Sequence, residues 1–301
     1  MSRNSSRVLV AFAVTVVAFG LAVVPIPRDD LLTTEVQDAL HAVGFALLTF
    51  FVVRAVSHSG PRPWLHAALG LVFVLLLAVG TEGIQKFTPR DSDPFDFARD
   101  LLGIAIGTAA AALPWARSLA RRALLVIVVV TGTLATVSPV ATTMWVLELR
   151  REHFPVLHEF EETWERHFLV ARGADLRFEP EGYGRLTLSE GNYPALIVRE
   201  VPADWTDYDH LCFRIAGEGG VPANLIVRVD DVRHDGTYTD RFQRRIGVTA
   251  GWTDVMIPLR AIRNGPSGRE LDLAAVETLV LFGTPSTPRP LIVRIDALRL
   301  E

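Results

Sequence analysis

The segment Ala123–Leu147, ALLVIVVVTGTLATVSPVATTMWVL, decides how this chain is organised. It is an apolar run without a charged side chain, and it exceeds the roughly 20 helical residues that cross the hydrocarbon core of a bilayer. Soon after it the composition changes, because from Phe154 onward short stretches of β-forming residues alternate with glycine, proline and aspartate. The chain therefore divides into a membrane domain, residues 1–149, and a β domain, residues 150–301.

Four further apolar segments precede this one. The five predicted spans are residues 8–25, 39–56, 64–81, 97–115 and 123–147. Half of all residues are hydrophobic, 50%, and nearly all the long apolar runs lie before residue 149, which indicates a membrane protein rather than a soluble one. The first segment follows Arg3 and Arg7 as a secretory signal would, but it is longer than a typical signal core, so we interpret it as a span.

The short loops differ in their content of Lys and Arg, which stay preferentially on the cytoplasmic side of a membrane. One predicted side carries these arginines and no acid among them: Arg3, Arg7, Arg54, Arg62, Arg117, Arg121 and Arg122. The other carries Arg28, Lys86, Arg90 and Arg99 amid many acids. This asymmetry predicts a multi-pass protein of the plasma (inner) membrane with a cytoplasmic N-terminus. An odd number of spans then makes the β domain extracytoplasmic, although Arg150 and Arg151 oppose this orientation.

Polar residues gather where the second, third and fourth predicted spans meet the outer membrane surface. The candidate cluster there consists of His41, Glu82, Gln85, Arg90, Asp96 and Asp100. Ionisable groups at membrane depth are usually paired or functional. Either Glu82 or His41 acts as a general acid or base while Arg90 holds an anion, or ion pairs simply fix the loop on the bilayer. The sequence contains no H-E-x-x-H, no phosphate-cradling loop and no serine elbow, which favours binding over catalysis.

This region resembles the VanZ-like family. The matching residues are Glu82-Gly-Ile-Gln85-Lys-Phe87, then Arg90, Asp96, Gly103 and Gly107, together with the helix segment His41-Ala-Val-Gly-Phe45. The resemblance implies a cell-envelope protein from a family associated with glycopeptide-antibiotic resistance, without naming a reaction. Gln37-Asp38 replaces the family's Asp-Lys pair and Asp100 its asparagine, so roles that need that lysine or a neutral amide do not carry over. The G-x-x-x-G spacing at Gly103 is expected to serve close helix packing.

The β domain is predicted to be an all-β sandwich. We expect strands at residues 167–171, 185–188, 195–199, 210–215, 224–229, 241–248, 253–258, 277–281 and 291–300, with an opening strand at 154–161 and a turn at Asp235-Gly236. The segments 204–213, 251–259 and 295–300, with Phe160-Glu161, resemble jelly-roll, galactose-binding-like carbohydrate-binding modules. This resemblance implies the fold and leaves the ligand open, because many such modules serve as packing or interaction units.

The densest polar cluster of the β domain lies in one predicted hairpin. Its candidate ligand-binding residues are Asp230, Asp231, His234, Asp235, Tyr238, Asp240 and Arg241. Carboxylates bind sugar hydroxyls well, while Tyr and Arg supply donors and apolar faces. Trp205 and Trp252 are candidates for stacking on sugar rings, with Tyr183 and Tyr193 as alternatives. The opposing interpretation is a solvated hairpin and tryptophans that pack in the core.

The sequence also bears on metals, thiols and nucleic acid. Glu161 and Asp296 stand at positions where the resemblance implies a structural Ca²⁺, although no EF-hand loop is present and ordinary surface carboxylates are the alternative. The single cysteine, Cys212, excludes an intrachain disulfide and is expected to be a buried small hydrophobic residue. A net charge of -4 without a basic, aromatic-rich stripe excludes nucleic acid as a partner.

Three functions stay open from the sequence. In the first, a VanZ-like membrane unit in the lipid bilayer carries an extracytoplasmic sandwich that recognises cell-wall or extracellular polysaccharide. In the second, a membrane enzyme acts on a lipid-linked or anionic envelope precursor at the outer leaflet. In the third, the sandwich docks onto a partner protein and the polar clusters are scaffolding. The sequence favours the first, with binding rather than turnover as the activity.

Overall fold

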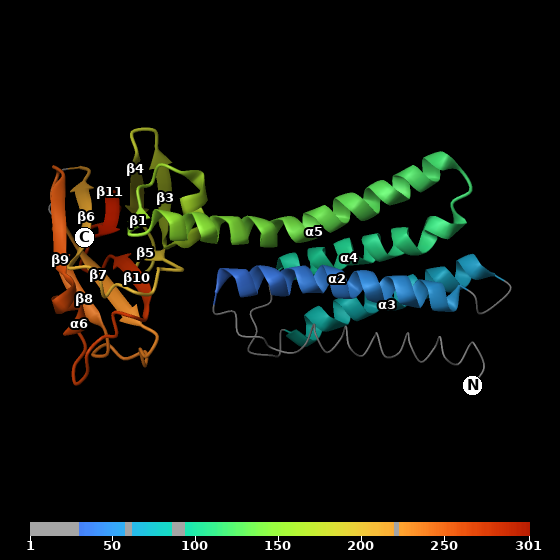
Figure 1. Ribbon diagram of the computed structural model, residues 1–301, viewed down its shortest axis with the longest axis horizontal. Coiled ribbons are helices and arrows are strands. Elements are labelled where there is room, and N and C mark those ends of the chain that lie inside the picture. The colour runs from blue at the N-terminus through green and yellow to red at the C-terminus, as the bar shows by residue number, and fades with distance from the viewer. Residues whose placement is uncertain (1–29, 58–61, 86–93, 220–222) are drawn as a thin grey trace. The chain divides into compact units, whose positions relative to one another are not determined.

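The computed structural model describes residues 30–57, 62–85, 94–219 and 223–301 of the chain (Figure 1). The chain forms two compact units, Met1–Met144 and Trp145–Glu301, which we call the helical unit and the β unit. The division falls inside helix α5 (Leu119–His153), a few residues before the domain boundary expected from the sequence. The first predicted span, residues 8–25, lies outside the described residues.

Four described helices are long and apolar enough to cross a membrane. They are α2 (Leu31–Val56), α3 (Pro63–Gln85), α4 (Pro94–Ala112, followed by the 3-10 turn η1, Leu113–Trp115) and α5. They coincide with the predicted spans at 39–56, 64–81, 97–115 and 123–147. Helix α2 begins well before residue 39 because Asp30 caps it, its carboxylate accepting the Thr33 N–H at 2.6 Å.

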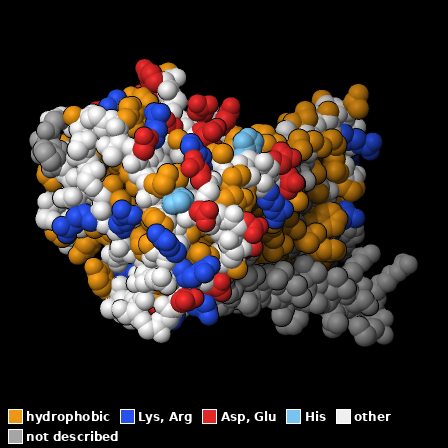
Figure 2. Space-filling view, turned by 60° about the vertical axis from the view of Figure 1, so that its left-hand side comes forward, with side chains coloured by type: hydrophobic (Ala, Val, Ile, Leu, Met, Phe, Trp, Pro, Cys, Tyr) orange, Lys and Arg blue, Asp and Glu red, His pale blue; other side chains and the backbone are white. Residues whose placement is uncertain are grey.

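Large hydrophobic side chains cover the outer surfaces of these helices. Leu69, Leu76 and Leu134 are 60%, 66% and 63% exposed. Surface of this kind is costly in water and is accommodated by lipid, so it indicates membrane association. Figure 2 shows the hydrophobic side chains gathered over the helices, whereas Arg, Lys, Asp and Glu side chains are frequent over the β unit.

Helices α2 and α4 pack at backbone contact distance. A Cβ atom added to Gly103 or Gly107 would lie 2.2 Å from the backbone oxygen of Ala42 or Ala46, respectively. No side chain fits in that space, because real Cβ atoms do not approach a backbone oxygen so closely. The expected packing role of the G-x-x-x-G pair is therefore confirmed.

The β unit is a sandwich of two antiparallel sheets. One sheet has the order β3 (Ala174–Glu179), β4 (Tyr183–Leu188), β11 (Leu291–Leu300), β6 (His210–Gly217) and β9 (Thr253–Pro258), with β1 (Val156–His158) also pairing with β11. The other has the order β2 (Leu169–Arg172), β5 (Ala195–Val198), β10 (Val276–Phe282), β7 (Ala223–Asp231) and β8 (Phe242–Val248). Two short helices, η2 (Thr163–Phe168) and α6 (Leu259–Arg263), complete the unit. The predicted all-β sandwich is confirmed.

The core of the sandwich follows from the alternation of side chains along each strand. On β7, for example, Leu225, Val227 and Val229 are fully buried against the other sheet, whereas the residues between them face outward. Strand β3 was not predicted, although its Leu176 and Phe178 alternate with charged residues and pack against the core. The alternation is the signal that would have identified this strand.

Candidate functional site

The five-stranded sheet, β2-β5-β10-β7-β8, carries an ordered row of side chains on its outward face. Cross-strand pairing places Arg172, Ala195, Phe282, Ile226 and Arg245 side by side across β2, β5, β10, β7 and β8. The centre of this row is apolar, and an arginine stands at each end. Since antiparallel neighbours in register lie on the same face, the sheet itself fixes this arrangement.

A second row lies beside the first on the same face. It consists of Val170, Ile197, Val280, Arg228 and Gln243, in the same strand order. Four of the five members of this row also line the hollow described next, Val170 being the exception. The two rows together give an apolar floor with polar and cationic groups toward the β7 and β8 side.

The sheet face is hollowed by a groove of about 540 Å³. Its lining is Arg172, Tyr193, Ala195, Ile197, Ile226, Arg228, Tyr238, Arg241, Gln243, Arg245, Val280, Phe282, Thr284 and Pro285. A smaller hollow of about 160 Å³ adjoins it and shares Ile226, Arg245 and Thr284 with it. A volume of this size lies within the range of sites that bind small molecules or oligomers.

Two exposed tyrosines stand at the sides of the groove. Tyr193, just before β5, is 60% exposed, and its ring meets the edge of Phe282 with 6.3 Å between ring centroids. Tyr238, in the loop between β7 and β8, is 72% exposed, and the Arg241 guanidinium lies over its ring at 4.9 Å. Such contacts hold both rings in place while leaving much of their surface open to a ligand.

The polar side of the groove is held by Arg228. Its guanidinium contacts the buried Asp230 carboxylate at 2.6 Å and 2.9 Å, and its Nη2 lies 3.1 Å from His234 Nε2. The other ring nitrogen of His234, Nδ1, is 2.7 Å from the Asp240 backbone oxygen. An Nδ1–H donor and an Nε2 acceptor satisfy both contacts, so the neutral imidazole joins the strand to the loop.

A second arginine, Arg269, holds the base of the same loop. It donates to the Asp231 carboxylate at 2.6 Å and 2.7 Å and to the Asp240 carboxylate, at 3.0 Å through Nη2. The hydrogen bond from Arg269, helped by the Asp235 N–H, lowers the pKa of Asp240 to about 2. Burial would raise the pKa of Asp231, but the bonds from Arg269 and the Asp272 N–H outweigh it and leave that pKa lowered.

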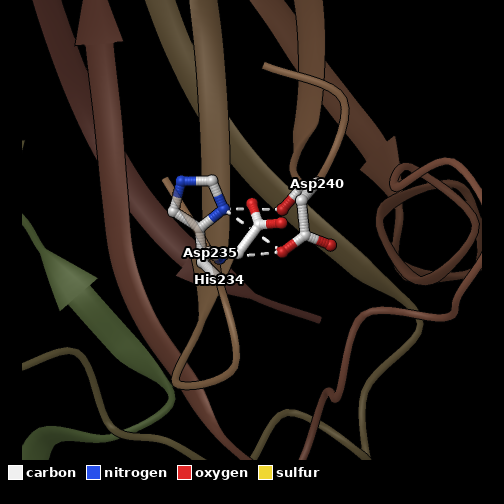
Figure 3. Close-up of side chains that lie close together, drawn as sticks. All are labelled: His234, Asp235 and Asp240. Atoms are coloured by element: carbon white, nitrogen blue, oxygen red, sulfur yellow. Dashed lines mark hydrogen bonds and ion pairs between the residues drawn. The ribbon is translucent and has the colours of Figure 1, made fainter. Parts of the chain in front are cut away.

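The ligating atoms of His234, Asp235 and Asp240 come within 4.8 Å of one another (Figure 3). This is the one group among the described residues whose His, Cys, Asp or Glu side chains could hold a metal ion. Asp240 is nevertheless engaged by Arg269, and His234 by Arg228. Because the guanidinium groups of Arg228 and Arg269 already supply the positive charge, we interpret these three side chains as contacts that fix the conformation of the loop.

The predicted hairpin residues therefore divide into two sets. Tyr238 and Arg241 line the groove. The others do not line it but position the loop through the arginines and backbone groups just described; they are Asp230, Asp231, His234, Asp235 and Asp240. The groove residues that were not predicted from the sequence are Arg172, Arg228, Arg245 and Gln243; their signal was an outward position in strands with apolar inward neighbours.

The two candidate tryptophans have different surroundings. Trp205 is fully buried in the core and donates its ring N–H to the Pro202 backbone oxygen at 2.8 Å. Trp252 is 38% exposed and belongs to the face of the other sheet, where it lies between Arg214 at 4.8 Å and Arg294 at 5.0 Å. Neither lines the groove.

The two residues expected to hold calcium, Glu161 and Asp296, make separate contacts with other residues. Asp296 forms an ion pair with Arg214 at 3.0 Å. Glu161 is exposed beside Gly182, and its backbone N–H donates to Glu165 at 3.0 Å. Cys212 is buried in β6 as expected, and burial raises the pKa of its thiol to about 11.

In the helical unit the structure brings part of the predicted polar cluster together. His41 Nδ1 lies 3.3 Å from Asp100, and Arg99 contacts Asp38 at 2.7 Å and Asp96 at 2.8 Å. His41, Asp96 and Asp100 are all buried. The contacts of His41 with Asp100 and of Arg99 with Asp38 join α2 to α4, whereas that of Arg99 with Asp96 lies within α4, and together they form a paired polar network within apolar helices. Arg90 and the side chains of Glu82 and Gln85 lie outside the described part of the chain.

Comparison with protein-family models gives no match, and comparison with curated proteins gives none either. Similar solved structures include an agarase, AgWH50C, with 16% identity and a TM-score of 0.39, which covers 48% of this chain and 24% of that one. An exo-beta-agarase has 17% identity, the same TM-score and coverage of 48% and 25%. The matched region is thus about a quarter of either agarase.

A carbohydrate-binding module is also similar. The family 11 module from Clostridium thermocellum, solved in complex with a beta-1,3-1,4-mixed-linked tetrasaccharide, has 15% identity and a TM-score of 0.37. The similarity covers 48% of this chain and 93% of that module. A similarity of fold does not specify a ligand, so the ligand of the β unit has to be inferred from its own groove.

Proposed function

We propose that the β unit binds a polysaccharide chain in the groove over its five-stranded sheet. The observation that carries this proposal is the cross-strand row of Arg172, Ala195, Phe282, Ile226 and Arg245. An apolar floor bounded by hydrogen-bond donors suits a sugar ring, which has apolar C–H faces and a polar rim. The groove supports binding, because among the described residues its lining offers donors and apolar faces but no carboxylate or histidine to serve as a general acid or base.

The two groove tyrosines supply the second feature that a sugar chain needs. Tyr193 and Tyr238 present large exposed rings on which the flat face of a pyranose can stack. Arg228, Arg241 and Gln243 then supply donors along the β7 and β8 side. Since Arg228 and Arg241 are already held by Asp230 and Tyr238, little side-chain entropy is lost when a ligand binds.

We further propose that the groove is displayed outside the cytoplasm by a VanZ-like unit in the plasma membrane. The support is the asymmetry of Lys and Arg among the loops and the resemblance around His41 and from Glu82 to Asp96. Membrane anchoring would keep a polysaccharide-binding module at the cell envelope, where such polymers occur. Protease added to intact cells should then cleave within residues 150–301, and cleavage only after lysis would contradict this placement.

The experiment for the binding proposal uses the full chain in a sugar-free nonionic detergent. Titration against a panel of soluble neutral and acidic polysaccharides should find at least one that binds. The double variant Tyr193→Ala, Tyr238→Ala should lose about tenfold or more in affinity, since each stacked ring contributes about 0.5–1.5 kcal/mol. Met256→Ala, which removes an exposed side chain from the other sheet, is the matched control and should bind as the unaltered chain does.

Two results would contradict the proposal. One is a complete lack of binding across the panel. The other is loss of binding in Trp252→Ala together with normal binding in the double tyrosine variant, which would move the site to the face of the six-stranded sheet.

A further inference from the structure

The groove is strongly cationic, although the whole chain is acidic. Of the residues that the structure describes, four arginines line it, namely Arg172, Arg228, Arg241 and Arg245, and no Asp or Glu does. The chain as a whole has a net charge of -4. The lining itself thus carries an excess of positive charge, and a hollow lined by one sign of charge attracts ligands of the other.

One of the four arginines is neutralised by the protein itself. Asp230 lies directly against Arg228, with two contacts below 3 Å. Among the described residues, no carboxylate oxygen comes within ion-pairing distance of Arg172, Arg241 or Arg245. Arg172 and Arg245 therefore keep their hydrogen-bond donors available for an anion that the protein does not provide, whereas Arg241 also donates to the Gln243 side-chain oxygen, at 2.7 Å from its Nη2.

The surroundings of Arg241 agree with an excess of positive charge. Burial lowers its pKa, and repulsion from the neighbouring Arg228 lowers it further, against a smaller opposing effect of Asp230. The Tyr238 ring, 4.9 Å from the Arg241 guanidinium, offsets only part of this repulsion. A bound oxyanion beside Arg241 would relieve this repulsion.

The spacing of the arginines favours a polymer over a small ion. Arg172 and Arg245 stand on the two edge strands of the sheet, four strand spacings apart, which corresponds to about 19 Å. The floor between them is apolar, and the hollow continues past Arg245 toward Asn224 and Thr287. A single anion meets one or two of these arginines, whereas a chain with repeated negative charges meets the whole set.

We infer that the groove takes an acidic polysaccharide, one whose sugar units carry carboxylate or sulfate groups. This inference rests on the proposed polysaccharide-binding function and names its ligand class. The planar guanidinium fork matches the paired oxygens of either group, and the apolar floor accepts the sugar faces between the charges.

The test compares polymers that differ in charge alone. Polygalacturonate and its full methyl ester share one backbone, and dextran sulfate and dextran share another. The full chain in sugar-free detergent should bind the charged member of at least one pair about tenfold or more tightly than the neutral member. The first pair identifies a carboxylate ligand and the second a sulfate ligand.

The variants assign that preference to the groove. Arg172→Gln and Arg245→Gln should each weaken binding of the charged polymer by about three- to tenfold and leave binding of the neutral one nearly unchanged. Arg177→Gln is the matched control, because this exposed strand arginine lies outside the groove and pairs with Asp175. It should not change the affinity.

The outcomes separate this inference from the function on which it rests. Equal affinity for the charged and neutral members of both pairs, with a loss in Tyr193→Ala, Tyr238→Ala, would overturn the acidic ligand and keep polysaccharide binding. An equal effect of Arg177→Gln and Arg172→Gln would reduce the preference to general surface charge and also overturn it. Absence of binding to every polymer would overturn both proposals.

Discussion

Arg172 and Arg245 occupy the two ends of one cross-strand row, on opposite edge strands of the same sheet. Everything between them in that row, Ala195, Phe282 and Ile226, is uncharged. A ligand that contacts both arginines must lie across the strands and over the apolar floor. This relationship is the geometric reason for expecting an extended ligand with polar groups at intervals.

Salt should weaken the binding of an acidic polysaccharide. Arg172 and Arg245 are exposed, and screening shortens the reach of a charge to about 3 Å in 1 M salt, compared with about 10 Å in 0.1 M. We expect titrations over this range to show a fall in affinity of about tenfold. The variant Arg172→Gln, Arg245→Gln should show a shallower dependence, and an unchanged slope would place the charged contacts elsewhere.

Loss of Arg269 should destabilise the β unit and loosen the loop between β7 and β8. Asp231 is fully buried, and Arg269 is its bidentate partner, so Arg269→Ala leaves a buried carboxylate with much weaker compensation. We expect a loss of about 2–3 kcal/mol in the free energy of unfolding. Denaturation of the full chain, followed by near-ultraviolet circular dichroism, measures it.

The matched control for that variant is Arg177→Ala. Its partner Asp175 is exposed, so this pair should contribute less than about 1 kcal/mol. Similar losses in the two arginine variants would show that the contacts of Arg269 are no more important than those of a surface pair.

His158 should make the stability of the β unit depend on pH. Burial, with the nearby charge of Arg150, lowers the pKa of His158 to about 4 despite the opposing attraction of the Glu165 carboxylate, 3.6 Å from Nδ1. An unfolded histidine has a pKa near 6.5, so between these values the unfolded chain binds a proton that the folded chain does not. The free energy of unfolding should therefore fall by up to about 3 kcal/mol as pH decreases from about 6.5 to about 4.

Denaturation midpoints at several pH values check this dependence. In His158→Gln the free energy of unfolding should fall less between pH 6.5 and 5. In His167→Gln, which removes an exposed histidine, it should fall as in the unaltered chain. A decline of the same slope in His158→Gln would assign the effect to other groups.

Gly103→Ala should disrupt the packing of α2 on α4. The added methyl group would overlap the Ala42 backbone oxygen, which is part of a helix and has little room to move. We expect a loss of at least about 1–3 kcal/mol, seen as a lower thermal midpoint of the full chain in detergent. Gly44→Ala, where nothing lies within 4 Å, is the control. Equal midpoints in the two variants would contradict the close approach.

The elements of the fold were largely predictable because they depend on local patterns. Long apolar runs identified four of the helices, and alternation identified most strands. The exceptions are short: β1 was expected only as part of a longer segment, and β3 carries charged residues at its outward positions. Residues 8–25 remain a predicted span outside the described chain.

The groove was less predictable, because it depends on which strands are neighbours. Arg172 and Arg245 are distant in sequence, and the sheet order β2-β5-β10-β7-β8 alone puts them in one row. The tryptophans make the same point. Trp205 and Trp252 are each followed by Thr-Asp, yet one is fully buried and the other lies on an outer face. The local Trp-Thr-Asp motif therefore predicted a strand or loop but not whether the tryptophan faces the core or the outside.

The most direct measurement is hydroxyl-radical footprinting of the full chain with and without a bound polysaccharide. Tyr193 and Tyr238 are exposed beside the groove, and Trp252 is exposed on the other sheet as an internal reference. Binding in the groove should protect both tyrosines from oxidation and leave Trp252 unchanged. Protection of Trp252 with undiminished oxidation of the tyrosines would contradict a polysaccharide site over the five-stranded sheet.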